Sequence, residues 1–271
     1  MNRNSVLPAA VLALAAAHPA LPARAANWAA LVLDYQPGSN PAAGYTNTAA
    51  LLGEPSRVTP DPFGGPVDPF SPPWQPGQLL SLGAGGSVTV QFGAPVRDDP
   101  ANPFGLDFLI FGSAGFIPPS GDSPGGGLTA GPLFAPHTGG PRVSVSPDGG
   151  SWYVLDPALA PTVDGFWPTD GQGDFTRPVN PALTAADFDG QGLAGIRALY
   201  AGSGGGTGYD LAWARDGASQ PVALGQIEYL RIEVLSGRAD VDAVSAVPEP
   251  GPAALLALGG LALAARRRLR R

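Results

Sequence analysis

Residues 142–155 read RVSVSPDGGSWYVL. Valine alternates with polar residues up to Ser146, the segment Pro147–Gly150 follows, and the chain returns through Ser151–Leu155, which is apolar from Trp152 on. Alternation with a period of two is typical of a strand with one buried face. Asp and Gly in the middle favour a tight turn. The stretch therefore predicts a β-hairpin.

Four further stretches have strand patterns. Residues 87–92 (SVTVQF) and 229–235 (YLRIEVL) alternate between apolar and polar side chains. Residues 106–111 (LDFLIF) are apolar except for Asp107, and residues 240–244 (DVDAV) alternate again. These runs are short and are separated by long stretches rich in Gly and Pro, so we expect short strands joined by long connections.

The composition supports an all-β fold. The 271 residues include 39 Gly and 32 Pro, which break helix interiors. A hydrophobic fraction of 44% argues against disorder. We predict one antiparallel β-sandwich domain over residues 26–246 with long Gly/Pro-rich loops. Residues 36–78 are expected to form a long irregular loop, anchored on the domain by Phe63, Phe70 or Trp74.

The N-terminus has the three parts of a secretory signal peptide. Arg3 is followed by an apolar run and then by Ala23 and Ala25, which flank Arg24 in an A-x-A site. This pattern predicts a signal peptide over residues 1–25 that is cleaved before Ala26. A buried N-terminal helix is the alternative, and the prolines in the segment argue against it.

The C-terminal segment 247–271 also has three parts. It contains Pro248-Glu249-Pro250, then an apolar stretch, then an arginine cluster with Arg266, Arg267 and Arg268. The apolar stretch would form about 22 Å of helix, which is shorter than the roughly 30 Å hydrocarbon core of a bilayer. The arginines would stay on the cytoplasmic side.

This order of parts, in a chain with a signal peptide, resembles the PEP-CTERM sorting signal. The resemblance implies that an exosortase is a partner and that the short hydrophobic helix anchors the chain transiently in the membrane. It also implies export through the inner membrane of a Gram-negative-type bacterium to the cell surface or extracellular matrix. An ordinary C-terminal anchor is the alternative. The resemblance covers the tail only and does not say what the domain does.

Two parts of the domain resemble galactose-binding-like (discoidin-type) jelly rolls. One is the hairpin Val143–Trp152, and the other is Tyr229–Ile232 followed by Asp240–Val244. Segments 82–90 and 102–108 are similar to uncharacterised surface domains that carry the same tail. The resemblance implies a jelly-roll-like sandwich that binds glycans, lipids or proteins through its loops. It carries no binding residues over to this chain.

The domain is strongly acidic. Between residues 26 and 247, eight of the 15 basic residues and 21 of the 22 acidic residues remain, a net charge of −13. This charge disfavours nucleic acids and anionic membranes as partners. It suits divalent cations or neutral polymers, and much of it serves solubility.

The inventory of catalytic residues is small. The chain has no Cys, every basic residue is Arg, and His137 is the one histidine outside the signal peptide. Cysteine nucleophiles, P-loop lysines and histidine-based zinc sites are therefore excluded for a single chain. No Gly-x-Ser-x-Gly elbow occurs. We therefore predict a protein that is not an enzyme. Paired carboxylates remain the alternative, because a glycosidase needs only two.

Calcium is the cofactor that the acidic residues suit best. Asp107 lies within an apolar strand, so it needs a partner, either an arginine such as Arg231 or a cation. Asp240 and Asp242 are expected on one face of a strand, where they repel each other unless a cation or an arginine lies between them. A solvated face is the alternative. Residues 205–210 fit the start of one calcium-binding nonapeptide repeat, but a single copy cannot form that β-roll.

Aromatic residues offer a second type of site, because sugar rings present apolar C–H faces. Trp167, Tyr209 and Trp213 are the predicted ligand platforms, whereas Trp152 is expected in the hairpin core. We predict a non-catalytic component of the surface or matrix that binds polysaccharide or has a structural role. A glycan-active hydrolase or lyase and a protein-binding adhesin are the alternatives.

Overall fold

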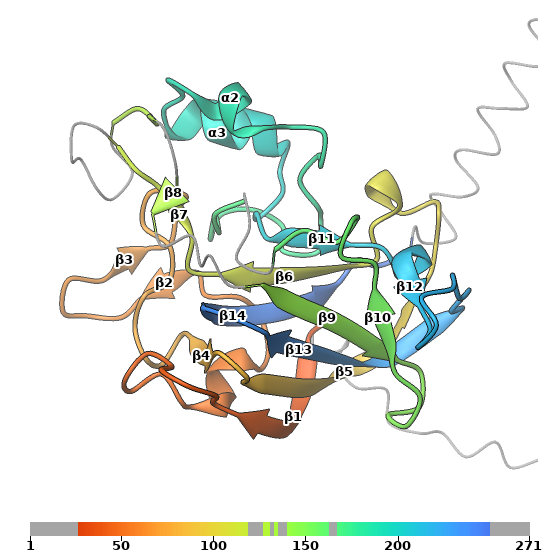
Figure 1. The fold of residues 1–271 in the computed structure, drawn as a ribbon. Helices are drawn as coiled ribbons and strands as arrows, with labels where there is room; N and C mark the ends of the chain where they lie inside the picture. Colours follow the sequence, from red (N-terminus) through yellow and green to blue (C-terminus); the bar gives the residue numbers. More distant parts are fainter. Residues whose placement is uncertain (1–26, 119–126, 131–132, 135–139, 163–166, 250–271) are drawn as a thin grey trace, which may run out of the picture.

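The computed structural model describes residues 27–118, 127–130, 133–134, 140–162 and 167–249 (Figure 1). In this part of the chain strands predominate over helices, and every pair of neighbouring strands is antiparallel. The predicted all-β antiparallel class is confirmed.

The larger sheet has six strands in the order β1-β5-β13-β9-β10-β12. The strands are β1 (Ala29–Gln36), β5 (Ser87–Arg97), β9 (Pro141–Ser146), β10 (Tyr153–Leu155), β12 (Ala214–Arg215) and β13 (Gln226–Val234). The predicted hairpin is confirmed as β9–β10, with Tyr153 opposite Val145. Its turn is closed by Asp148, whose Oδ1 accepts the N–H groups of Gly150 at 2.8 Å and Ser151 at 2.7 Å.

The smaller sheet has four strands in the order β11-β6-β14-β4. They are β4 (Leu80–Gly83), β6 (Phe108–Gly112), β11 (Thr207–Tyr209) and β14 (Arg238–Ala246). Two minor pairs lie outside both sheets, β2 (Val58–Thr59) with β3 (Gly65–Pro66), and β7 (Gly115–Phe116) with β8 (Leu133–Phe134).

The two sheets enclose one hydrophobic core. The larger sheet contributes Val88, Val90, Leu230 and Ile232, and the smaller contributes Phe108, Ile110, Val241 and Val244. Strand β6 is apolar without alternation because it is buried on both faces. Its other face carries Leu109 and Phe111, which pack with Trp28, Phe175 and Val247.

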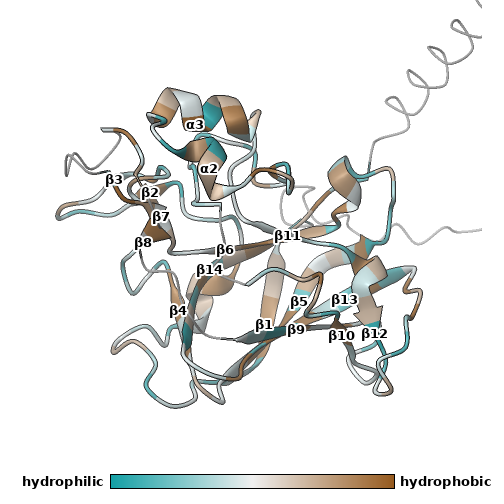
Figure 2. Ribbon diagram, turned by 45° about the horizontal axis from the view of Figure 1, so that its top comes forward, coloured by the Kyte–Doolittle hydropathy of each residue, from teal (hydrophilic) through white to brown (hydrophobic). Residues whose placement is uncertain are grey.

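Two short helices, α2 (Ala185–Phe188) and α3 (Leu193–Tyr200), were not among the predicted elements. They lie on the side of the smaller sheet that faces away from the larger one (Figure 1). Apolar residues at 193, 196 and 200 give α3 a buried face, and its ribbon carries both hydrophobic and hydrophilic segments (Figure 2). Ile196 and Tyr200 pack with Phe188.

The stretch between β1 and β4 is largely irregular, as expected for residues 36–78, and contains one 3-10 turn, η1 (Thr48–Leu51). Phe70 anchors it, since its side chain is only 2% exposed. Phe63 and Trp74 are 93% and 47% exposed, so their prediction as anchors was wrong. Phe63 lies in the short connection between β2 and β3, and about half of the Trp74 side chain remains accessible to solvent.

Several predictions fall outside the described residues. These are the signal peptide with Ala23, Ala25 and Ala26, and most of the sorting signal, including Pro250, Arg266, Arg267 and Arg268. Pro248 and Glu249 are described and exposed, and Glu249 pairs with Arg97 at 3.2 Å. Among the helices in the described ranges, none is long and apolar enough to cross a membrane.

Candidate functional site

A pocket of about 610 Å³ lies between the smaller sheet and α2. We call it the tryptophan pocket; its walls include Phe104, Leu106, Leu159, Trp167, Val179, Leu183, Thr184 and Trp213. Trp167 and Trp213 were predicted as ligand platforms from separate parts of the sequence, and the fold brings both to this one pocket. A volume of this size is typical of a small-molecule site.

Each tryptophan packs against other apolar side chains of the protein and remains partly accessible to solvent. Trp167 packs on Phe188 with ring centroids 5.4 Å apart, and Trp213 packs against the inter-sheet core. Both side chains are half-buried. Trp213 ends the 3-10 turn η3 (Leu211–Trp213), which begins directly after Asp210.

Phe104 at the pocket wall has an unusual backbone conformation. It lies in the 3-10 turn η2 (Pro103–Gly105) with φ of 61°, and its side chain is 55% exposed. A bulky residue in the left-handed region is an outlier, and such residues gather at ligand-binding sites. An exposed aromatic ring held in this way is available to a ligand.

Tyr209 is not a ligand platform, and that prediction was wrong. Its side chain is fully buried, its ring stacks on Phe108 with centroids 5.1 Å apart, and its hydroxyl donates to the Pro161 carbonyl at 3.2 Å. The residue lies on β11, whose alternation turns its side chain into the inter-sheet core.

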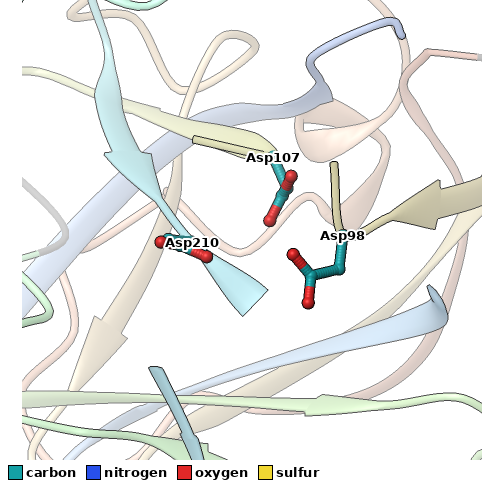
Figure 3. Close-up of side chains that lie close together, drawn as sticks. All are labelled: Asp98, Asp107 and Asp210. Carbon is teal, nitrogen blue, oxygen red and sulfur yellow. The ribbon is translucent and has the colours of Figure 1, made fainter. Parts of the chain in front are cut away.

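Three carboxylates converge beside the pocket. Asp98 follows β5, Asp107 precedes β6, and Asp210 follows β11; one oxygen of each lies within 4.8 Å of the others (Figure 3). We call these residues the aspartate cluster. Among the residues that the structure describes, it is the one group of three or more acidic or histidine side chains with the spacing of a metal site.

Asp107 is the buried member of the aspartate cluster, with 0% of its surface exposed. Its Oδ1 accepts hydrogen bonds from the Asp99 N–H at 3.1 Å and from Asn102 Nδ2 at 3.0 Å. Its Oδ2 accepts the Leu211 N–H at 2.9 Å. The predicted need for a partner is met by these neutral donors.

The aspartate cluster holds charges that disfavour one another. Burial raises the pKa of Asp107 to about 6, against hydrogen bonds that lower it, and the neighbouring Asp210 adds to the rise. Burial also raises the pKa of Asp210, with a contribution from Asp98, and that of Asp98, with a contribution from Asp99. The charges acting on these three carboxyls are thus other aspartates.

Arg231, the arginine considered as a partner for Asp107, lies on the larger sheet instead. Its guanidinium sits 4.0 Å from the centroid of the Trp152 ring, and its Nε donates to Thr89 Oγ1 at 3.1 Å. Trp152 is therefore on the outer face of the hairpin and not in its core, which corrects that expectation. The alternation of β13 explains both positions, because it sends Arg231 away from the core.

Asp240 and Asp242 both have protein partners and do not join the aspartate cluster. Asp242 lies at a register shift of β14, where its two oxygens accept the Ser56 N–H and hydroxyl, each at 2.8 Å. Full burial raises its pKa to about 7. Asp240 pairs with Arg238 at 3.4 Å. The solvated face considered for this pair is wrong, because both side chains are buried.

Sequence reasoning missed Asp98, Asp210 and Asn102. The segment 205–210 was recognised for its resemblance to a calcium-binding repeat, and its last residue, Asp210, is the one that lies in the aspartate cluster. Asp98 begins a run of turn-forming residues after a strand, which is an ordinary place for an aspartate. No local pattern connects these positions, because the sheet pairing brings them together.

No protein-family model matches this chain, and no curated protein matches it.

Proposed function

We propose that this protein binds polysaccharide without catalysing a reaction, through the tryptophan pocket. The observation that carries the proposal is the convergence of Trp167, Trp213 and Phe104 on one concave site. Their rings offer the apolar surfaces on which sugar rings stack. The acidic domain favours a neutral polymer, because an anionic one would be repelled.

The proposal includes the type of β-sandwich, which is jelly-roll-like and similar to galactose-binding-like domains. It is supported by two antiparallel sheets around one core and by the position of β9, β10 and β13 next to one another in the larger sheet. The tryptophan pocket is built largely from connections, among them the β5–β6 loop and η3. Ligand binding by loops on a sandwich is the mode that the resemblance implies.

The cellular part of the proposal rests on the two ends of the sequence. A signal peptide over residues 1–25 and a PEP-CTERM-like segment over residues 247–271 support export, recognition by an exosortase and delivery to the cell surface or extracellular matrix. Glu249 lies exposed at the end of the described domain. The tail therefore leaves the folded domain at an accessible point.

A glycan-active hydrolase or lyase is the second candidate. It is favoured by the short distance between the carboxylates of Asp107 and Asp210 and by the raised pKa of Asp107, a property of general acids. The complete burial of Asp107 weighs against it, because a substrate bond must reach the acid. We therefore prefer the non-catalytic function.

The test uses the full-length protein and polysaccharide purified from the producing bacterium's own extracellular matrix. Co-sedimentation without release of reducing sugar is expected. Release of oligosaccharides that is lost in Asp210→Asn would make the protein an enzyme. Absence of co-sedimentation would overturn the proposal and favour an adhesin with a protein partner.

A further inference from the structure

The aspartate cluster places negative charge from three distant chain segments at one point. Asp98 and Asp210 are half-buried and Asp107 is fully buried, so water screens their repulsion poorly. The nearest arginine in sequence, Arg97, forms its ion pair with Glu249. Among the residues that the structure describes, no arginine forms an ion pair with any of these three carboxylates.

Asn102 supplies an independent observation. Its side chain is 4% exposed, and its Nδ2 donates to Asp107 Oδ1 at 3.0 Å, which places the amide at the aspartate cluster. The other end of the amide, Oδ1, is buried and has no hydrogen-bond partner. A buried acceptor without a donor is costly, and such groups in native structures commonly face an ion or a water molecule.

We propose that the aspartate cluster and Asn102 bind a calcium ion. All four side chains offer oxygen, the donor atom that hard cations prefer. Ligands that come from loops and strand ends form a flexible, irregular set, which suits calcium with its six to eight oxygens better than magnesium with its strict octahedron. Backbone carbonyls and water complete such a shell.

Two of the ligands, Asp107 and Asp210, keep carboxylate lone pairs that are available to a cation. Asp210 Oδ1 accepts the Ala212 N–H at 2.7 Å as the N-cap of η3, which leaves Oδ2 for the ion. Oδ2 lies beside Gly105, 3.8 Å from the position a Cβ would take there. Asp107 Oδ2 accepts one hydrogen bond and keeps a lone pair.

The ion would connect the two turns that shape the tryptophan pocket. The β5–β6 connection carries Asp98, Asn102 and Phe104, and η3, which begins directly after Asp210, ends at Trp213. One calcium ion bound to both segments fixes Phe104 relative to Trp213. This consequence, unlike the metal site itself, rests on the proposed polysaccharide binding.

The experiment titrates calcium into the chelator-treated full-length protein. Isothermal titration calorimetry measures binding, and thermal unfolding measures the change in melting temperature. We expect one site and a rise of the melting temperature with calcium, because the ion binds the folded state only. Affinities near 10⁻⁴–10⁻³ M are typical of extracellular modules, roughly the range to be covered. Magnesium should bind more weakly.

Two isosteric variants test the assignment, so that a failure of one to fold leaves the other. Asp98→Asn and Asp210→Asn each remove one charge and should weaken calcium binding by more than about tenfold. Asp216→Asn is the matched control, because Asp216 also accepts backbone N–H groups in a turn, those of Ala218 and Gln220, outside the cluster.

The outcomes separate the site from the function. No heat and no thermal shift with calcium, or equal affinity in all three variants, would overturn the metal site while leaving polysaccharide binding testable. Calcium binding that depends on Asp98 and Asp210, in a protein that does not bind polysaccharide, would support the site and overturn the proposed function.

Discussion

The backbone N–H of Leu211 donates to Oδ2 of Asp107 at 2.9 Å, across 104 positions of sequence. The acceptor is a buried carboxylate next to β6, and the donor is the first residue of the turn that places Trp213 in the tryptophan pocket. The charge state of the aspartate cluster and the geometry of the pocket are therefore linked through one hydrogen bond.

Replacing Asn102 with Asp should make the protein more dependent on calcium. A fourth carboxylate adds repulsion in the absence of metal and adds a charged ligand in its presence. We expect a lower melting temperature than wild type in chelator and a larger rise on adding calcium. Differential scanning calorimetry with and without calcium measures both. An Asn102→Asp protein whose melting temperature responds to calcium as wild type does would contradict this prediction.

Stability should fall as the pH rises from about 4 to about 7 because of Asp242. Full burial raises its pKa from 3.8 to about 7, so its folded form binds a proton that the unfolded form releases. The stabilisation from this proton is fully present below the pKa of the unfolded state and is lost as the pH rises through the pKa of the folded state. The free energy of unfolding falls with a slope on the order of 1 kcal/mol per pH unit.

The variant Asp242→Asn isolates this effect. An amide can accept the Ser56 N–H with its oxygen and donate to the Ser56 hydroxyl with its nitrogen, so both existing contacts are kept. Urea unfolding at pH 5 and pH 8 measures the free energy of unfolding of both proteins. The stability of the variant relative to wild type should increase as the pH rises. A difference between the two proteins that is the same at both pH values would show that Asp242 does not titrate in this range.

Phe108 should be a major contributor to stability. Its ring is fully buried between the sheets and stacks on Tyr209. Phe108→Ala should cost about 3–5 kcal/mol of unfolding free energy, the usual range for a buried phenylalanine. Phe63→Ala is the matched control, because this ring is 93% exposed, and should change stability by about 0.5 kcal/mol or less. Urea denaturation measures both; similar losses would contradict the described core.

Much of the fold follows from local pattern. The hairpin 142–155 and the strand 229–235 were predictable because alternation and turn residues act over a few positions. The helix α3 was missed because eight residues beside several glycines give a weak periodic signal, although residues 193, 196 and 200 do carry it.

The site was only half predictable, for a physical reason. A charged residue in an apolar strand identifies Asp107, because burying a carboxylate has a recognisable cost. Its partners are set by sheet pairing: β11 lies beside β6 and delivers Asp210, and the end of β5 delivers Asp98. The same long-range placement buried Tyr209 and moved Arg231 to the opposite face, which no local pattern indicated.

The central claim is that the tryptophan pocket binds polysaccharide, and affinity measurement on three tryptophan variants tests it most directly. Trp213→Ala and Trp167→Ala should each weaken binding of the matrix polysaccharide at least about tenfold, or about 1.4 kcal/mol. Trp152→Ala, which removes an equal ring on the outer face of the larger sheet, should leave the affinity unchanged. Equal affinity in all three variants and wild type, or a loss confined to Trp152→Ala, would contradict the account.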